Sequence, residues 1–153
     1  MPKQLDLDTT YLKMADQWGQ LSKARRKKVG CLIVKDSQII SDGYNGTPAG
    51  CDNECEFVNE RFLPQAENKL ETKPEVLHAE SNALMKLAKS TNSSKDSTIY
   101  LTMSPCFDCA KLIIQAGVVR VVYSQEYRNQ EGIEFLRSNN VIAELVKIPI
   151  SSN

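Results

Sequence analysis

The sequence lacks the positive net charge that would favour binding to a polyanion, and it has no long apolar run. Its 153 residues contain 19 lysines and arginines against 19 aspartates and glutamates. Proteins that follow a phosphate backbone usually carry a basic excess, so we expect no nucleic-acid partner. No apolar stretch is long enough for a membrane span or a secretory signal, which predicts no membrane partner and a cytoplasmic location. Internal repeats and low-complexity tracts are also missing, so we expect one domain over residues 1–153.

Histidine is almost absent, whereas cysteine is not: the chain has one histidine and five cysteines. In a reducing compartment these thiols are expected to be buried, metal-binding or reactive rather than paired in disulfides. Cys31 falls in a predicted strand and is expected to be a small buried side chain, with Cys51 and Cys55 as loop thiols. A second zinc site would need all three and a further ligand, so we do not expect one.

The apolar pattern predicts an amphipathic first helix followed by a β-hairpin. Apolar side chains recur at steps of four and three in the first segment, which predicts that they form its core face. These residues are Leu7, Tyr11, Met14, Trp18 and Leu21. Residues 29–34 and 38–40 are rich in β-branched side chains and are separated by three polar residues, as in a hairpin. Residues 44–77 lack a clear period and are expected to form a long functional loop with room for one helical turn.

The second half of the chain alternates between helical and extended patterns. Helices are predicted at 79–90, 107–116 and 130–138, and strands at 98–103, 119–123 and 141–146. Such alternation favours right-handed crossovers between parallel strands. Together with the antiparallel hairpin it predicts an α/β fold, a three-layer α-β-α sandwich on a mixed five-stranded sheet.

One histidine and two cysteines have the composition of a catalytic zinc site. His78 opens a His-Ala-Glu tripeptide, and Cys106 and Cys109 form a Cys-x-x-Cys motif at a predicted helix start. Residues three apart share a helix face, so both thiolates can reach one ion, and the unpaired N–H groups there stabilise them. A Cys₂His set leaves one tetrahedral position for water. Glu80 lies two residues after the histidine and can take a proton from that water without binding the metal.

Two simpler interpretations of these residues are a structural zinc site and a redox-active Cys-x-x-Cys pair. A structural site normally closes with four protein ligands, and neither interpretation gives Glu80 a role. The order His-x-Glu followed by Pro-Cys-x-x-Cys is the signature of zinc-dependent deaminases. We therefore predict Zn²⁺ bound by His78, Cys106 and Cys109, with Glu80 as the catalytic acid and base.

Longer segments resemble one family within that superfamily. His78–Leu84, Ser104–Lys111, Gln115–Gly117, the Gly43–Gly50 run GYNGTPAG and the upstream Arg26…Val29-Gly30 are similar to the deoxycytidylate (dCMP) deaminase family. The resemblance covers residues 8–146 and implies a cytidine deaminase-like fold and hydrolysis of dCMP to dUMP and ammonia, which would feed thymidylate synthesis.

The resemblance also implies roles for single residues. Glu80 would carry protons to N3 of the base and then to the leaving amine, while the Ala79 backbone N–H holds the base carbonyl and the Ser104 carbonyl accepts from the amine. Asn45 would bind the sugar hydroxyl. Arg26, Tyr127 and Arg128 would meet the phosphate.

The densest positive cluster of the chain, residues 23–28, contains the implied phosphate ligand Arg26. A guanidinium suits a phosphate because it presents a fixed fork of donors. Lys23, Lys27 and Lys28 are interpreted as a solvated helix end. Turnover of dCTP would require further cations from Arg25, Lys27, Lys28 or Arg128.

The resemblance further implies a homohexamer, activation by dCTP with Mg²⁺ and inhibition by dTTP at an effector site near the GYNG loop. Several alternatives stay open. They are a deaminase that also acts on dCTP, a polynucleotide deaminase acting on tRNA or single-stranded DNA, a deaminase of a free base or nucleoside, and a zinc-stabilised binding module without activity. The segment 57–74 could be a lid, an effector or subunit contact, or an insertion.

Overall fold

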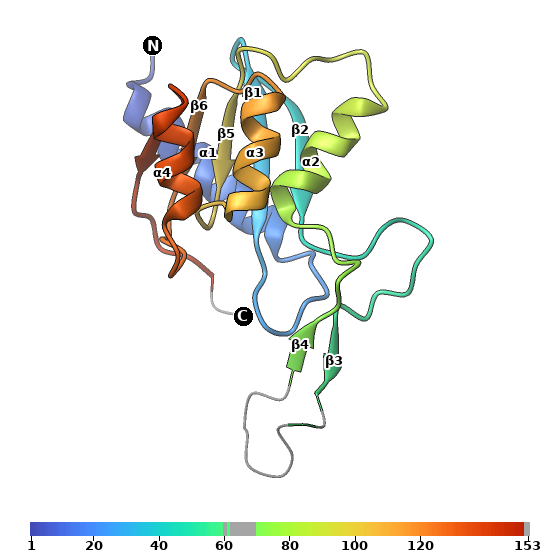
Figure 1. The fold of residues 1–153 in the computed structure, drawn as a ribbon. Helices are drawn as coiled ribbons and strands as arrows, with labels where there is room; N and C mark the ends of the chain where they lie inside the picture. The colour runs from blue at the N-terminus through green and yellow to red at the C-terminus, as the bar shows by residue number, and fades with distance from the viewer. Residues whose placement is uncertain (60, 62–69, 152–153) are drawn as a thin grey trace.

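The computed structural model describes residues 1–59, 61 and 70–151 (Figure 1). Its elements, in chain order, are α1 (Gln4–Gly19), β1 (Gly30–Lys35), β2 (Gln38–Tyr44), β3 (Glu56–Val58), β4 (Leu70–Thr72), α2 (Ala79–Ala88), β5 (Thr98–Leu101), α3 (Phe107–Gln115), β6 (Arg120–Tyr123), α4 (Glu131–Ser138) and β7 (Ile142–Leu145). Within the described ranges, no helix is both long and apolar enough to span a bilayer.

Five strands form a mixed sheet in the order β2-β1-β5-β6-β7. Strand β1 runs antiparallel to β2 and to β5, whereas β5, β6 and β7 are parallel to one another. The parallel pairs are those joined through α3 and α4, as the alternating pattern predicts. The sheet therefore confirms the mixed five-stranded fold expected from the sequence.

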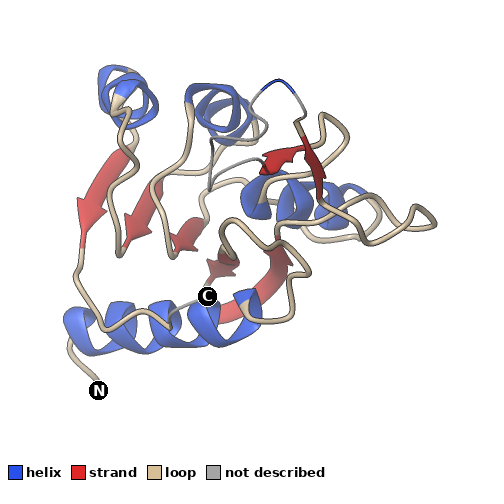
Figure 2. Ribbon diagram, turned by 90° about the horizontal axis from the view of Figure 1, so that it is seen from below, coloured by secondary structure: helices blue, strands red, loops and turns tan. Residues whose placement is uncertain are grey.

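Helices cover both faces of this sheet, so the molecule has three layers (Figure 2). Side chains of one strand face point to α2, α3 and α4, and the alternate side chains point to α1. In β1, for example, Cys31 and Ile33 pack in the first cluster and Leu32 and Val34 in the second. This alternation follows from the two-residue period of a strand and gives nearly every β1 side chain a buried position.

The predicted core face of α1 is wrong in part: Leu7 and Tyr11 are half-buried, and Tyr11 packs against the core. Met14, Trp18 and Leu21 are exposed, Trp18 at 37% and Leu21 at 49%. The buried face instead contains Asp8, Leu12, Ala15, Asp16 and Gly19. Periodicity misses it because two of these residues are carboxylates, which are buried only when they have partners.

Both buried carboxylates of α1 have such partners. Asp8 accepts hydrogen bonds from Arg120 at 2.6 and 2.8 Å and from the Tyr100 hydroxyl at 2.7 Å. Asp16 accepts from the backbone N–H and hydroxyl of Ser151, near the end of the described chain. The bonds of Asp8 dock α1 against β5 and β6, and those of Asp16 join α1 to the segment after β7.

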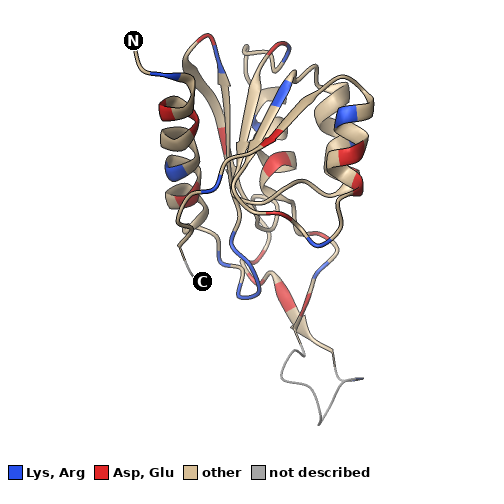
Figure 3. Ribbon diagram, turned by 90° about the vertical axis from the view of Figure 1, so that its left-hand side faces the viewer, with Lys and Arg blue, Asp and Glu red and all other residues tan. Residues whose placement is uncertain are grey.

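That loop carries the basic cluster 23–28. Because α1 ends at Gly19, the interpretation of Lys23, Lys27 and Lys28 as a helix end is wrong. The cluster lies between α1 and β1, beside the hairpin formed by β3 and β4, where Figure 3 shows basic and acidic residues facing one another. The sequence did not predict this hairpin, and most of the residues between its strands lie outside the described ones. The alternatives given for the segment 57–74 concern residues 60 and 62–69, which lie outside the described residues.

Candidate active site

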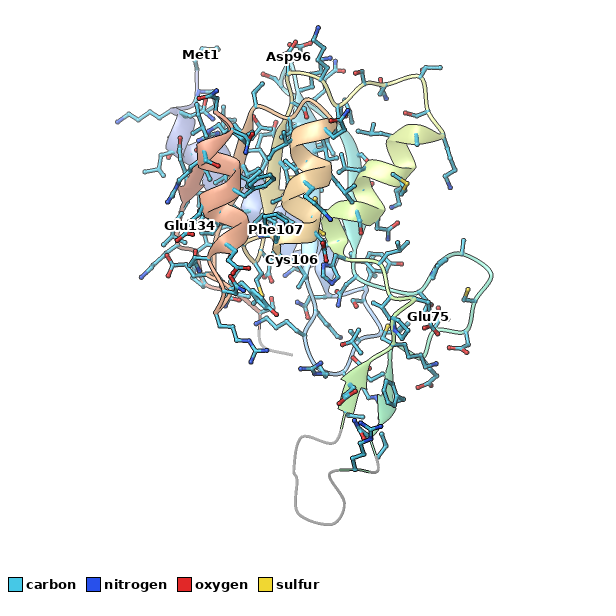
Figure 4. All side chains as sticks on the ribbon, in the orientation of Figure 1. Met1, Glu75, Asp96, Cys106, Phe107 and Glu134 are labelled. Carbon is cyan, nitrogen blue, oxygen red and sulfur yellow. The ribbon has the colours of Figure 1, made fainter. Side chains whose placement is uncertain are left out.

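Two helix N-termini bring the metal-binding residues together. His78 is the N-cap of α2 and Cys106 is the N-cap of α3, and neither side chain makes a capping hydrogen bond. Both side chains are thus available to an ion, and Cys109 follows one turn into α3. Figure 4 shows Cys106 at the end of α3 that adjoins the start of α2. The positive ends of both helix dipoles face this point and favour negatively charged sulfur.

The distances between the donor atoms fit a tetrahedral zinc ion. His78 Nδ1 lies 3.5 Å from Cys106 Sγ and 3.4 Å from Cys109 Sγ. Zinc bonded at about 2.3 Å to sulfur and about 2.1 Å to nitrogen separates two such atoms by about 3.6 Å. These three residues form the one group of potential metal ligands found among the described residues, with all donor atoms within 4.8 Å of one another. Cys31, Cys51 and Cys55 are not part of it.

The electrostatics of the cluster also suit a cation. Hydrogen bonding from Cys109 and from His78 lowers the pKa of the Cys106 thiol to about 4, against the opposing effect of its burial. The hydrogen bond to Cys106 raises the pKa of His78, although burial opposes it. The lowered pKa favours the thiolate form of Cys106, which is the form of cysteine that binds metals, whereas the hydrogen bond to Cys106 and burial raise the pKa of the Cys109 thiol.

Glu80 lies in the first turn of α2 and is 4% exposed. Burial raises the pKa of its carboxyl group, which also interacts with the Cys109 thiol. The carboxyl group therefore lies beside the metal cluster without belonging to it. A buried carboxyl group with a raised pKa can both accept and donate a proton near neutral pH.

The cluster opens into a cavity of about 270 Å³. Its walls come from the basic loop, the GYNG segment, the β3–β4 hairpin and the starts of α2 and α3. The lining residues are Ala24, Arg26, Lys27, Val29, Asn45, Cys55, Glu56, Thr72, Val76, His78, Ala79, Glu80, Met103, Ser104, Cys106 and Tyr127. The cavity therefore brings together all the predicted site residues except Arg128 and Cys109, which is the buried member of the metal cluster.

The basic cluster divides between this cavity and the protein surface. Arg26 lines the cavity, where its guanidinium donates to the Thr72 hydroxyl at 3.3 Å. Arg25 instead makes ion pairs with Glu56 at 3.7 Å and Glu54 at 4.0 Å. Lys28 points its ammonium group to a backbone carbonyl of the loop, at 3.5 Å.

Asn45 has a structural task that the sequence did not reveal. Its side-chain oxygen accepts from the Val29 N–H at 2.9 Å, and its amide nitrogen donates to the Lys27 carbonyl at 2.7 Å. An amide has two N–H donors and two acceptor lone pairs, so one of each is left for a ligand. Asn45 thus shapes the basic loop and still faces the cavity.

The segment after β6 closes another side of the site. The Ser104 hydroxyl accepts from the Tyr127 N–H at 2.6 Å, and the Ser104 N–H donates to the Gln125 carbonyl at 2.8 Å. Ser104 is buried, and Tyr127, at 36% exposed, lines the cavity. Arg128 is exposed and is not among the lining residues, so the structure does not bring it to the predicted phosphate site.

The cavity also contains residues that the sequence did not single out. Lys27 is half-buried in its wall, and Glu56 and Thr72 reach it from β3 and β4. The position of Lys27 in the basic cluster was a usable signal. The hairpin residues had none, because strands of three residues are too short to show a period that separates them from loop.

Comparison with known proteins gives one consistent result. The family model described as "Cytidine and deoxycytidylate deaminase zinc-binding region" matches residues 5–125. Deoxycytidylate deaminase of Enterobacteria phage T2 is 34% identical, over 92% of this chain and 92% of its own. The human deoxycytidylate deaminase is 39% identical over 79% of this chain and 66% of its own.

Solved structures agree with the sequence relatives. A dCMP deaminase from the cyanophage S-TIM5, solved in complex with dCMP and dUMP, superposes with a TM-score of 0.84 at 41% identity, covering 95% of this chain and all of that one. The chain therefore belongs to the deoxycytidylate deaminase family of zinc-dependent, cytidine deaminase-like proteins.

Proposed function

We propose that this protein catalyses the hydrolytic deamination of dCMP, in which dCMP and water give dUMP and ammonia. The carrying observation is the His78–Cys106–Cys109 cluster with buried Glu80 beside it, opening into a cavity that contains a guanidinium. The phage T2 and human relatives are named deoxycytidylate deaminases, and the S-TIM5 enzyme was solved with dCMP and dUMP.

We assign the proton transfers to Glu80. Zinc held by His78, Cys106 and Cys109 would act as a Lewis acid and lower the pKa of water. It would thus supply the nucleophile for C4 of the base near neutral pH. The Glu80 carboxylate takes a proton from the attacking water and delivers it to N3. The proton of the new C4 hydroxyl then passes through the same carboxyl group to the exocyclic nitrogen, the C4–N bond breaks with formation of the C4 carbonyl, and ammonia leaves. One group can serve both transfers because burial raises the pKa of the Glu80 carboxyl group, which makes it easier to protonate than an exposed carboxylate.

Backbone groups would hold the base. The Ala79 N–H is the first of α2, and such groups have no partner within their helix, so it is suited to donate to the base carbonyl. The Ser104 carbonyl would accept from the exocyclic amine, with Ser104 itself fixed through its hydroxyl. Asn45 would use its remaining donor or acceptor for the sugar hydroxyl.

Arg26 and Tyr127, which both line the cavity, would bind the phosphate. A monophosphate is favoured over a triphosphate because Arg25 is paired with Glu54 and Glu56, and Arg128 does not line the cavity. Lys27 is the further cation in the wall. A polynucleotide substrate is disfavoured by the zero net charge.

Regulation, assembly and location are further proposals that rest on the family. They comprise a homo-oligomer, a hexamer by resemblance, activation by dCTP with Mg²⁺, inhibition by dTTP, one domain and a cytoplasmic location. Light scattering on the purified protein tests the assembly, and dCMP saturation curves with and without each triphosphate test the regulation. A hyperbolic curve that neither triphosphate changes would contradict the regulatory proposal.

The proposed activity is tested by ammonia release from dCMP and from deoxycytidine, with the Arg26→Ala variant as a probe of the phosphate site. Loss of a charge-assisted hydrogen bond costs about 1.5–3 kcal/mol, or roughly 10- to 150-fold in kcat/KM. We expect this loss for dCMP and little change for deoxycytidine. Equal losses for both substrates would remove Arg26 from the phosphate site.

A further inference from the structure

Glu56 is a buried carboxylate that the deamination chemistry does not use. Its side chain is 2% exposed, and it lies in β3 on the wall of the active-site cavity. Oε1 accepts from two successive backbone N–H groups, those of Arg25 at 2.8 Å and Arg26 at 3.1 Å. Oε2 is buried without a hydrogen bond from the described residues and lies 3.7 Å from Arg25 Nε. Burying such a group is unfavourable unless its contacts compensate for desolvation.

The strand opposite Glu56 contacts the other end of Arg26. Glu56 and Thr72 are cross-strand partners in the β3–β4 register. The Thr72 hydroxyl accepts from the Arg26 guanidinium at 3.3 Å, while Glu56 binds the Arg26 backbone. One rung of the hairpin therefore fixes both the main chain and the side chain of Arg26. Figure 3 shows the basic loop and the hairpin side by side.

We propose that Glu56 is a positioning residue that orients Arg26 toward the substrate phosphate. The β3–β4 hairpin is then the element through which the enzyme distinguishes a nucleotide from a nucleoside. This inference rests on the proposed dCMP deaminase function and on Arg26 as the phosphate ligand.

The charge of Glu56 excludes a direct role at the phosphate and suits an indirect one. A carboxylate repels a phosphate, so its contribution must pass through the groups it holds. By pairing with Arg25, it also keeps the neighbouring guanidinium on the surface, where Glu54 binds it as well. A long side chain loses conformational freedom when it binds a ligand, and a fixed main chain with a bonded guanidinium reduces that loss.

The test is a double-mutant cycle on Glu56→Gln and Arg26→Ala, with steady-state kinetics for dCMP and deoxycytidine. Glutamine keeps the shape of the side chain, but its neutral oxygen binds the two N–H groups more weakly. Its NH₂ group is a donor like the Arg25 guanidinium and cannot pair with it. We expect the KM for dCMP to rise about tenfold, with kcat within about twofold and deoxycytidine turnover unchanged. In the Arg26→Ala background, Glu56→Gln should add nothing, because both changes act through one contact.

Glu54→Gln is the matched control. The change removes the same charge from the same neighbourhood, and Glu54 also contacts Arg25, but the Glu54 side chain is 72% exposed whereas that of Glu56 is 2% exposed. We expect wild-type kinetics from it. An equal rise in KM for Glu54→Gln would show that net charge, and not positioning, is responsible, and would overturn the proposal.

Thr72→Val is the second variant, and it carries the test if Glu56→Gln does not fold. Thr72 is exposed, so the change removes the bond to the guanidinium at little cost in stability. We expect the KM for dCMP to rise about two- to fivefold, with deoxycytidine unaffected. The proposal fails if Thr72→Val leaves the KM for dCMP unchanged, or if Glu56→Gln affects both substrates alike or multiplies the effect of Arg26→Ala.

Failure of this proposal is distinct from failure of the proposed function. If the wild type shows no preference for dCMP over deoxycytidine, the proposed function itself is wrong. If that preference is present and Arg26→Ala abolishes it, but Glu56→Gln and Thr72→Val do not reduce it, only the role of Glu56 is refuted. Zinc content and melting temperature are measured on every variant, so that loss of folding is not mistaken for loss of positioning.

Discussion

The ion pair between Asp8 and Arg120 joins α1 to β6 and should contribute substantially to the stability of the fold. The Asp8 side chain is 4% exposed and that of Arg120 16% exposed, and their two hydrogen bonds measure 2.6 and 2.8 Å. Removing one partner of such a buried pair costs about 3–5 kcal/mol, because the other charge stays buried. We take about 3 kcal/mol for Arg120→Met, since Tyr100 and Gln4 still donate to Asp8. A chain of this length loses about 2–4 °C in melting temperature per kcal/mol, which predicts a drop of about 6–12 °C.

The same ion pair predicts how the difference in melting temperature between the wild type and Arg120→Met depends on pH. Burial raises the pKa of Asp8, but hydrogen bonds from Arg120, Tyr100 and Gln4 outweigh it and hold the pKa below its ordinary value. A lowered pKa means that the stabilisation is fully present above the unfolded-state pKa of about 3.9 and is lost as pH falls through the folded-state value. In Arg120→Met the pKa of Asp8 rises toward its unfolded-state value. Protonation of Asp8 in acid therefore lowers the free energy of unfolding of this variant less than that of the wild type. The gap in melting temperature should narrow below about pH 4.

Thermal unfolding followed by circular dichroism between pH 7 and pH 3 measures the gap. The control is Glu144→Gln, which removes the other carboxylate bonded to Arg120, at 2.9 Å. Because the Glu144 side chain is 46% exposed, we expect this change to cost less than about 1 kcal/mol. A gap between wild type and Arg120→Met that stays constant down to pH 3 would refute the reasoning, because it would assign the loss to packing instead of charge.

Three further predictions concern the site. Glu80→Gln should retain zinc and fold but lose about 10²–10⁴-fold or more in kcat, and normal turnover with stoichiometric zinc would contradict its role. His78→Ala and Cys106→Ser should each lose the metal, measured by atomic absorption after dialysis; full retention by either would remove that residue from the ligand set. Gly132→Ala should lower both melting temperature and zinc affinity, because a Cβ there would lie 2.2 Å from the carbonyl oxygen of Pro105, next to a ligand. Wild-type values for both would show that α4 accommodates the methyl group without moving the Cys106 loop.

The parts of the site that sequence spacing controls could be predicted. Helix geometry places Cys106 and Cys109 on one face of α3, and Glu80 follows His78 by two residues at the start of α2. The proximity within each of these two pairs therefore follows from local structure. The parallel half of the sheet was also predictable, because its strands and helices are apolar in clear alternation. Both predictions depend on residues close together in the chain.

The features that were missed depend on contacts between distant residues. The buried face of α1 contains Asp8, whose partners Tyr100 and Arg120 lie 92 and 112 positions away. Glu56 resembles any polar loop residue until its carboxylate is seen to bind the backbone of residues 25 and 26. Arg128 fits a phosphate site by residue type, but it is exposed and does not line the cavity. Sequence patterns report local periodicity, and none of these tertiary partners has a local signature.

The central claim is that the zinc cluster and its cavity deaminate dCMP. The most direct test is ammonia release by the purified protein from equal concentrations of cytidine, deoxycytidine, CMP, dCMP and dCTP, with zinc content measured on the same sample. We predict about one zinc per chain and activity that strongly favours dCMP. Activity on dCTP equal to that on dCMP would contradict the monophosphate assignment, and no activity on any of the five with zinc bound would contradict the proposed function.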